Sequence, residues 1–370
     1  MNFTLSEEQQ ELVRTVHGFL EKRSPESEVR RLMAEGAAAD PAVWMQMGQQ
    51  LGLQGLIIPE QYGGAGYGYV ELGLVLEEIG AALLVSPFLS SVHAASALLI
   101  SNNESEQARY LPGLAAGERL GTLAIAEASG QWNCESIQTA AVADSDGYRI
   151  RGAKMYVLDG QFADFFVVGA RAADGLGLFI VDRDASGLTV TPLKTMDQTR
   201  AQARIEFDDA PARALSVGPD TSILIDRILA TAGIALAAEQ VGGAQRCLDM
   251  AVDYAKVRVQ FGKPIGSFQA IKHKCSDMLL QVESARSAAY YAAHVLDEDE
   301  GDPLAACALA QAYCSQAYSN VAGENIQIHG GIGFTWEHPA HLYFKRAKTS
   351  EVLLGDPATQ RERLAQLVGI

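Results

Sequence analysis

The chain has 370 residues, of which 48% are hydrophobic and 20% are charged, and its formal net charge is -16. This length suits two or three packed domains rather than one small core. Nucleic acids and anionic membrane surfaces attract clustered lysine and arginine, so the acidic balance argues against either as a partner. A few local cations would still be enough to bind a small anionic ligand.

The cysteines and the apolar segments restrict the class of protein further. The five cysteines are scattered and show no metal-ligand or CxxC spacing, so we expect all of them to be structural. No signal peptide precedes the first helical pattern, and no apolar run approaches the roughly twenty residues that span a bilayer. We therefore expect a cytoplasmic protein without a membrane partner.

The first third of the chain has the pattern of helices. Ser6 is placed to cap a helix whose apolar side chains fall on one face, and a second helical pattern follows around Trp44. Residues 59–66 contain paired glycines, which permit backbone angles that other residues avoid and interrupt regular structure. An apolar helical pattern resumes from Val70 to Leu84.

From about Leu120 the pattern changes to short β-rich runs separated by Asp and Gly turns, which predicts a small antiparallel sheet. The runs are Thr139–Ala143, Tyr148–Gly152, Phe165–Val168, Leu178–Val181 and Leu188–Thr191. After Ala210 and Pro211 the pattern returns to long helices, which indicates a helical bundle. The predicted helices cover roughly residues 222–257, 267–296, 304–329 and 340–367.

Four glycine-containing motifs mark the chain: Pro59–Gly66, Gly243–Arg246, Arg258–Lys263 and Gln327–Thr335. In this order they resemble the motifs of the acyl-CoA dehydrogenases, and the resemblance covers essentially the whole chain. It implies the α+β fold of that family. Residues 1–118 would form an N-terminal helical domain, residues 119–212 a middle antiparallel β domain, and residues 213–370 a C-terminal four-helix bundle.

The resemblance also implies a reaction. The family oxidises an acyl-CoA thioester to the 2,3-enoyl ester with FAD, and a glutamate removes the proton next to the carbonyl. That base stands at one of two positions, which are Leu354 and Ala232 in this chain. Neither side chain can accept a proton. Glu351, Asp356 and Glu239 are the nearby carboxylates, and each is first expected to be a surface or capping residue.

The contacts that the family makes to its own flavin ring are incomplete here. The loop that normally carries a Thr and a Ser has Ala126 and Trp132 at those positions. Leu158 replaces a third hydroxyl, and Asp356 begins the segment that replaces the family's Thr-x-Gln. Trp132 would either fill the unused flavin cavity or simply pack in the loop.

A second set of residues matches the family, namely the set that reaches the FAD of a neighbouring subunit. By resemblance, Arg258 would pair with the pyrophosphate and Phe261 would pack on the cofactor. Gln327 and the backbone of Gly330 and Gly331 would approach the adenosine end. We expect His329 to be a structural histidine.

These two sets lead to one hypothesis. The chain is expected to be the non-catalytic subunit of an α2β2 heterotetrameric acyl-CoA dehydrogenase, of the type that shortens steroid side chains in lipid metabolism. A second acyl-CoA dehydrogenase subunit would carry the catalytic glutamate, and an electron-transfer flavoprotein would accept the electrons. Two alternatives stay open: a homomeric FAD enzyme with a displaced base, and a non-enzymatic homologue that binds CoA esters.

Overall fold

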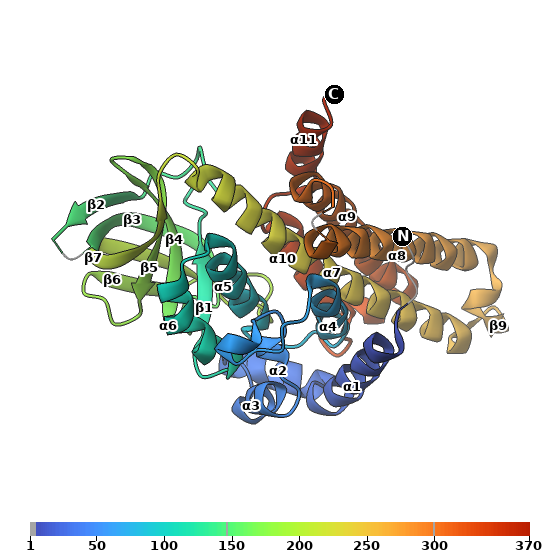
Figure 1. The fold of residues 1–370 in the computed structure, drawn as a ribbon. Coiled ribbons are helices and arrows are strands. Elements are labelled where there is room, and N and C mark those ends of the chain that lie inside the picture. Colours follow the sequence, from blue (N-terminus) through green and yellow to red (C-terminus); the bar gives the residue numbers. More distant parts are fainter. Residues whose placement is uncertain (1–4, 146, 299) are drawn as a thin grey trace. The chain divides into compact units, whose positions relative to one another are not determined.

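A computed structural model describes residues 5–145, 147–298 and 300–370. The chain divides into two compact units. The first comprises Met1–Arg31, Tyr69–Leu84 and Gly233–Ile370, and the second comprises Leu32–Gly68 and Val85–Ala232. The α+β class predicted from the sequence is confirmed, with helices at both ends of the chain and a sheet in the middle (Figure 1). The three predicted domain ranges stay a prediction.

The second unit is built around a sheet and carries helices from the N-terminal third. Its strands are β1 (Gly121–Ala124), β2 (Ala140–Asp144), β3 (Gly147–Leu158), β4 (Phe165–Ala172), β5 (Gly175–Asp182), β6 (Leu188–Pro192) and β7 (Gln202–Val217). Its helices are α3 (Pro41–Gln49), η1 (Leu53–Gly55), η2 (Glu60–Tyr62), α5 (Phe88–Ser101) and α6 (Glu104–Ala115). Helices α2 (Glu26–Glu35) and α7 (Thr221–Val257) contain residues of both units.

The sheet is mostly antiparallel, with two exceptions. Strand β1 pairs with β4 in parallel, and β2 meets β4 in parallel at one residue pair. Because β4 also pairs with β5, strands β4, β2, β3, β7 and β5 close into a ring. Alternate side chains of the strands fill its interior, including Ile150, Phe166, Phe179 and Ile205, all fully buried.

Strands β1 and β7 were missed by the sequence analysis. The long strand β7 runs through Ala210 and Pro211, where the sequence was expected to turn helical, and it continues to Val217. Pro211 lies opposite Arg149 in the ladder between β3 and β7. Proline lacks the N–H that a ladder uses, which is why it reads as a strand end in the sequence.

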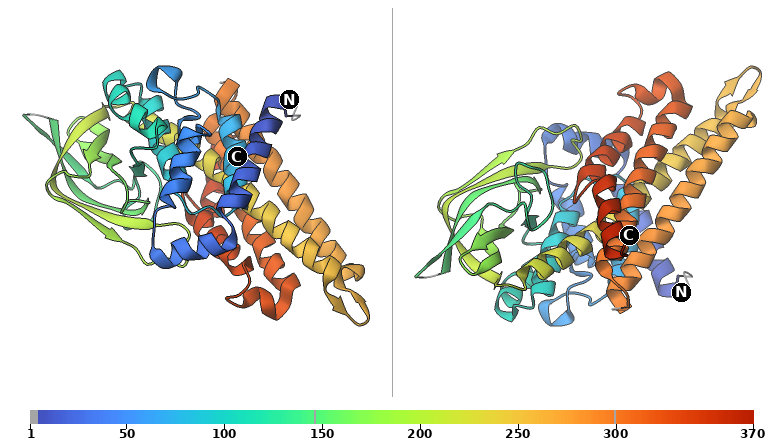
Figure 2. Two further views of the ribbon diagram at one scale, coloured as in Figure 1. Left: turned by 90° about the horizontal axis from the view of Figure 1, so that it is seen from below. Right: turned by 90° about the horizontal axis from the view of Figure 1, so that it is seen from above.

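The first unit is helical. It contains α1 (Glu7–Arg23), α4 (Tyr69–Ala81), η3 (Ile265–Ser267), α8 (Gln269–Glu298), α9 (Pro303–His329), η4 (Gly330–Phe334), α10 (Ala340–Val352) and α11 (Pro357–Leu367). Helix α9 packs against α8, α10 and α11. Between α7 and α8 the chain forms a hairpin of β8 (Val259–Gln260) and β9 (Lys263–Pro264), which projects from the ends of these helices (Figure 2).

Two sequence expectations about the helices were wrong. The predicted helix over 340–367 is two helices, because the backbone turns left-handed at Leu354 (φ 62°) and Pro357 starts α11 without an N–H to donate. The second expectation was that no apolar run is long enough to span a bilayer. Helix α7 contains an 18-residue window with a mean hydropathy of 1.5, long and apolar enough to do so. Since 72% of that window is buried within the protein, it has the properties of a core helix.

Helices α4 and α7 cross in direct backbone contact, because glycine stands at the crossing on both helices. A Cβ atom on Gly242 would lie 1.7 Å from the carbonyl oxygen of Glu77, and one on Gly80 would lie 2.0 Å from that of Glu239. Any larger residue at either position would push the helices apart.

We expect Gly242→Ala to destabilise the protein by about 3 kcal/mol, because the added methyl overlaps backbone that cannot move locally. Gly323→Ala in α9 is the matched control, since its Cβ would meet only Phe344 Cε2, at 3.9 Å. That variant should gain about 0.5–1 kcal/mol from helix propensity. Thermal or urea unfolding measures both, and equal effects would contradict the proposed crossing.

Candidate functional site

The predicted base position lies in the turn between α10 and α11. Leu354 is 6% exposed and adopts φ 62°, and its carbonyl accepts a hydrogen bond from Gln360 Nε2 at 2.8 Å. Ala232, the alternative position, is 1% exposed within α7. Each position thus holds a buried apolar side chain. Proton removal by this chain would require some other group.

The three nearby carboxylates are each engaged by other groups. Glu351 pairs with Lys348 at 2.7 Å on the last turns of α10. Asp356 caps α11 by accepting from the Thr359 N–H at 2.7 Å, and this bond lowers the pKa of Asp356. A carboxylate with a lowered pKa is a poorer proton acceptor.

Glu239 is the most deeply buried of the three. It accepts from Arg346 Nη1 at 2.8 Å, and both side chains are 4% exposed. The neighbouring Gln240 bonds Ser315 Oγ at 2.9 Å and the Ser350 carbonyl at 3.2 Å. This is a buried polar network across α7, α9 and α10, in which the charge of Glu239 is matched by a guanidinium.

The loop predicted to face the flavin ring belongs to the second unit. Ala126 is fully buried at its start, and Gly130 at its tip has φ 72°, a left-handed angle that glycine adopts without strain. Trp132 is half-buried. Asn133 Oδ1 accepts from the Ser136 N–H at 2.9 Å and so bonds within the loop itself.

Glu127 and Lys154 tie both ends of this loop to the sheet. One Glu127 oxygen accepts from the N–H groups of Gln138 and Thr139 at 2.9 Å, from Thr139 Oγ1 at 2.8 Å and from Lys154 Nζ at 2.8 Å. Lys154 is 0% exposed and also donates to the Ile125 carbonyl at 2.9 Å. The sequence analysis missed this pair, although the alternation of Ile150 and Lys154 along β3 places the lysine on the buried face.

Burial governs the charges of this pair. It lowers the pKa of Lys154 to about 8, against the opposing attraction of Glu127. Burial alone would raise the pKa of Glu127, but the hydrogen bonds from Lys154 and Thr139 outweigh it and hold that pKa below its usual value. Both groups therefore carry charge at neutral pH and form a buried ion pair.

The end of β3 that carries Leu158 has an unusual backbone. Tyr156 adopts φ 57° at an irregularity in the pairing of β3 with β7, and 37% of the residue is exposed. Val157 and Leu158 after it are buried. A Cβ on Gly130 would lie 3.8 Å from Tyr156 Cε2, so the tyrosine ring borders the loop.

The residues predicted to reach a neighbour's cofactor are exposed on the first unit. Within the described residues, Arg258 has no side-chain hydrogen bond or ion pair. Phe261 lies at the tip of the β8–β9 hairpin, is 91% exposed and has φ 53°. Its only described ring neighbour is Phe268, edge-on at 6.1 Å. The tip of the hairpin therefore presents an aromatic ring to solvent.

The other part of this set lies at the end of α9. Gln327 and both glycines are exposed, and Gly330 has φ 63°. A Cβ on Gly330 or Gly331 would meet no described atom within 4 Å. Packing within the described chain therefore does not explain why position 331 is a glycine. Ile332 and Phe334 in the same turn are 50% and 78% exposed.

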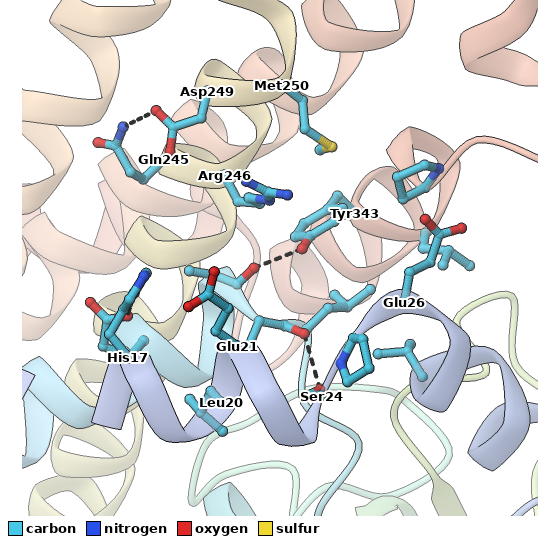
Figure 3. Close-up of a pocket in the computed structure, with 18 residues that line it drawn as sticks. His17, Leu20, Glu21, Ser24, Glu26, Gln245, Arg246, Asp249, Met250 and Tyr343 are labelled. Carbon is cyan, nitrogen blue, oxygen red and sulfur yellow. Dashed lines mark hydrogen bonds and ion pairs between the residues drawn. The ribbon is translucent and has the colours of Figure 1, made fainter. Parts of the chain in front are cut away.

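The cavity shown in Figure 3 lies elsewhere in the first unit and contains none of the predicted site residues. It has a volume of about 360 Å³ and lies between α1, α4, α7 and α10. Tyr343 donates to the Ala81 carbonyl at 2.7 Å and Ser24 to that of Ala82 at 3.3 Å, bonds that join its walls (Figure 3).

Comparison with known proteins identifies the class. The family model for the acyl-CoA dehydrogenase N-terminal domain matches residues 6–118, that for the middle domain residues 122–210, and that for the C-terminal domain residues 224–369. The chain therefore belongs to the acyl-CoA dehydrogenase family, whose cofactor is FAD.

Particular relatives are similar over nearly the full length. Acyl-CoA dehydrogenase IpdE2 of Mycolicibacterium smegmatis is 38% identical over 97% of this chain and 98% of its own. The solved Tcur3481-Tcur3483 steroid ACAD shares 32% identity with a TM-score of 0.89, covering 99% of both chains. The ChsE4-ChsE5 complex of Mycobacterium tuberculosis shares 29% identity with a TM-score of 0.90, covering 100% of this chain and 99% of that one.

The residues predicted for the two ends of FAD differ in their chemistry. Arg258 offers an exposed guanidinium fork suited to phosphate oxygens, and Gly331 offers backbone with open space around it. At the ring end, Ala126 and Leu158 are buried without hydroxyl groups, and Trp132 adds bulk. This chain alone therefore lacks side-chain hydroxyl donors at these positions, which the resemblance assigned to the flavin ring.

We expect Lys154→Met to destabilise the protein by about 3 kcal/mol, because Glu127 would keep its charge without a cation. Adding Glu127→Gln should recover most of that loss, since no unpaired charge remains. Arg204→Met is the control, because its pair with Glu206 at 2.8 Å is 45% and 43% exposed. It should change stability by less than about 1 kcal/mol. Unfolding measurements that show no recovery in the double variant would contradict this interpretation.

Proposed function

We propose that this chain is the non-catalytic subunit of a heteromeric, FAD-dependent acyl-CoA dehydrogenase with α2β2 composition. The observation that carries the proposal is Leu354, a buried leucine at the position of the family's catalytic glutamate. The alternative base position, Ala232, is equally unable to accept a proton. A partner subunit of the same family would supply the glutamate.

The reaction defines what each subunit must provide. The proton next to a thioester carbonyl is weakly acidic, so a base must lie within reach of the carbon while hydrogen bonds polarise the carbonyl. FAD, when bound, supplies the acceptor for the hydride from the adjacent carbon. In our proposal the partner provides the base and the flavin-ring contacts, and this chain provides binding and orientation.

This chain's part is to hold the distal end of the cofactor. Arg258 would donate to the pyrophosphate, and Phe261 would pack on the cofactor. Gln327 and the Gly330–Gly331 backbone would lie against the adenosine end. The exposure of all these groups supports the proposal, because a partner carrying FAD would cover them.

The remaining assignments follow from the relatives. Similarity to a steroid ACAD supports a steroid-derived acyl-CoA as the substrate class. The ChsE4-ChsE5 complex supports a second subunit of the same fold. We further propose an electron-transfer flavoprotein as the acceptor of the electrons, and a cytoplasmic location.

Two other functions make different predictions. A homomeric enzyme would need Glu351, Asp356 or Glu239 as the base, and each of these carboxylates already holds another group of the chain. A non-enzymatic homologue that binds CoA esters would contain no flavin even beside its cognate partner.

The test is co-expression with a candidate acyl-CoA dehydrogenase partner, followed by native mass and absorbance measurements. We expect a colourless or unstable chain alone, and a yellow heterotetramer with about one FAD per pair of chains. A yellow homotetramer with about one FAD per chain that oxidises acyl-CoA would overturn the proposal. A colourless complex would favour the non-enzymatic alternative.

In the assembled heterotetramer, Arg258→Ala should weaken FAD binding by about 30-fold, which corresponds to the loss of about 2 kcal/mol of charged hydrogen bonding. Lys256→Ala is the matched control two residues earlier, near the end of α7, where Lys256 is 69% exposed and pairs with Asp253 at 3.6 Å. It should change Kd about twofold or less. Equal effects of the two substitutions would remove Arg258 from the cofactor surface.

A further inference from the structure

Ring side chains surround the end of α9, and the proposed function gives them no role. His329 stacks on Tyr254 and meets His338 at a tilt, with ring centroids 4.3 Å and 4.2 Å away. Its Nδ1 donates to the Asn325 carbonyl at 2.8 Å. A Cβ on Gly333 would lie 2.7 Å from the Cβ of His329, so the short helix η4 lies directly against this histidine.

His338 in turn accepts a hydrogen bond from the start of the next helix. The N–H of Ala340, the first residue of α10, donates to His338 Nδ1 at 3.2 Å. An imidazole nitrogen accepts a hydrogen bond only while it carries no proton. Protonation would set two N–H groups against each other. It would also place a cation at a helix N-terminus, where the helix dipole is already positive.

Fixed charges around the cluster disfavour a further cation. Trp336 stacks on His341, with ring centroids 4.9 Å apart. Arg30 and Lys345 lie 5.3 Å and 5.1 Å from the centre of the Trp336 ring. Glu26 is the opposing carboxylate, but it is already paired with Arg30 at 2.7 Å. The groups that face the histidines are therefore two cations, one engaged anion and a tyrosine on α7.

The same surroundings set the titration of the cluster. Burial lowers the pKa of His329, His338 and His341, and the charge of a neighbouring histidine lowers that of His338 further. The unfolded chain therefore binds protons first as the pH falls below about 6.5. The stability that the neutral cluster contributes is present above that pH and is lost progressively below it.

We infer that His329 and His338 are positioning residues that hold the Gly330–Gly331 turn only while they are uncharged, so that mild acid releases the surface facing the cofactor. This inference rests on the proposed function, because it concerns the surface assigned to the adenosine end of FAD. Glu26 and Pro339, next to the cluster, also form part of the wall of the cavity in Figure 3.

The experiment compares the wild-type heterotetramer with His338→Asn between pH 7.5 and pH 5.5. An asparagine side chain accepts a hydrogen bond from the backbone N–H two residues further on. It therefore replaces the bond from the Ala340 N–H without adding a titratable proton. The matched control is His273→Asn, a substitution at an exposed histidine of α8. The first readout is amide hydrogen exchange of residues 330–342, corrected for the intrinsic effect of pH. The second is the rate of FAD release, followed by flavin fluorescence.

In wild type and the control we expect protection of residues 330–342 to fall about tenfold at pH 5.5, with FAD release faster by a similar factor. In His338→Asn both changes should be less than about threefold. If His338→Asn does not fold, His329→Phe keeps an aromatic ring without a charge and should respond to acid less than wild type, because His338 alone then titrates in the cluster.

The outcomes separate the two proposals. Loss of protection with the same pH profile in wild type and in both variants would overturn the inference, whatever the flavin content. A complex without FAD at pH 7.5 would count against the proposed function, and hydrogen exchange would still test the histidine cluster. FAD held at pH 7.5 with acid release unchanged by either variant would leave the proposed function standing and remove the cluster's role.

Discussion

The turn between α10 and α11 imposes the constraint on which the functional interpretation depends. The backbone reverses there through a left-handed Leu354 and a glycine, Asp356 caps the following helix, and the buried side chain at the turn is a hydrocarbon. Dehydrogenation of a thioester needs a proton acceptor within hydrogen-bond reach of the carbon. The turn thus carries a hydrocarbon where the reaction needs a proton acceptor, as expected of a subunit whose partner supplies the base.

The polar groups of the two units differ in how far they are already bonded within the chain. In the second unit the loop that would face a flavin ring is closed on itself, with Glu127 satisfied by Lys154 and Thr139 and with Ala126 buried. In the first unit Arg258 and Phe261 are exposed, and the described residues give Arg258 no side-chain partner. Exposed aromatic rings and cations without partners are typical of surfaces that another molecule covers.

The sequence predicted the fold class, the Ser6 cap and most of the long helices, because hydrophobic period and capping residues are local signals. It missed β7, because Pro211 reads as a strand end and only pairing with the distant strand β3 places it within a strand. It also joined α10 to α11, although Gly355 and Pro357 indicate a break. For the site, the family motifs led to Leu354 and Arg258, and these assignments stay predictions. The partners of Glu239 and Glu127, Arg346 and Lys154, lie at least 27 residues away in the chain, where no periodic pattern connects them.

The ion pairs of the candidate carboxylates help to decide between a non-catalytic subunit and an enzyme with a displaced base. If Glu239 swung away to remove a substrate proton, Arg346 would lose the carboxylate that bonds it in an environment that is 4% exposed. Separating a buried pair costs about 3–5 kcal/mol. Each 1.36 kcal/mol on a barrier is about a tenfold loss in rate, so this route begins roughly two to four decades slower. Glu351 and Asp356 face smaller penalties, but one would give up its ion pair and the other the cap of α11. A glutamate supplied by a partner subunit would break none of these bonds. A non-catalytic subunit is therefore the function that requires the fewest interactions of this chain to be lost.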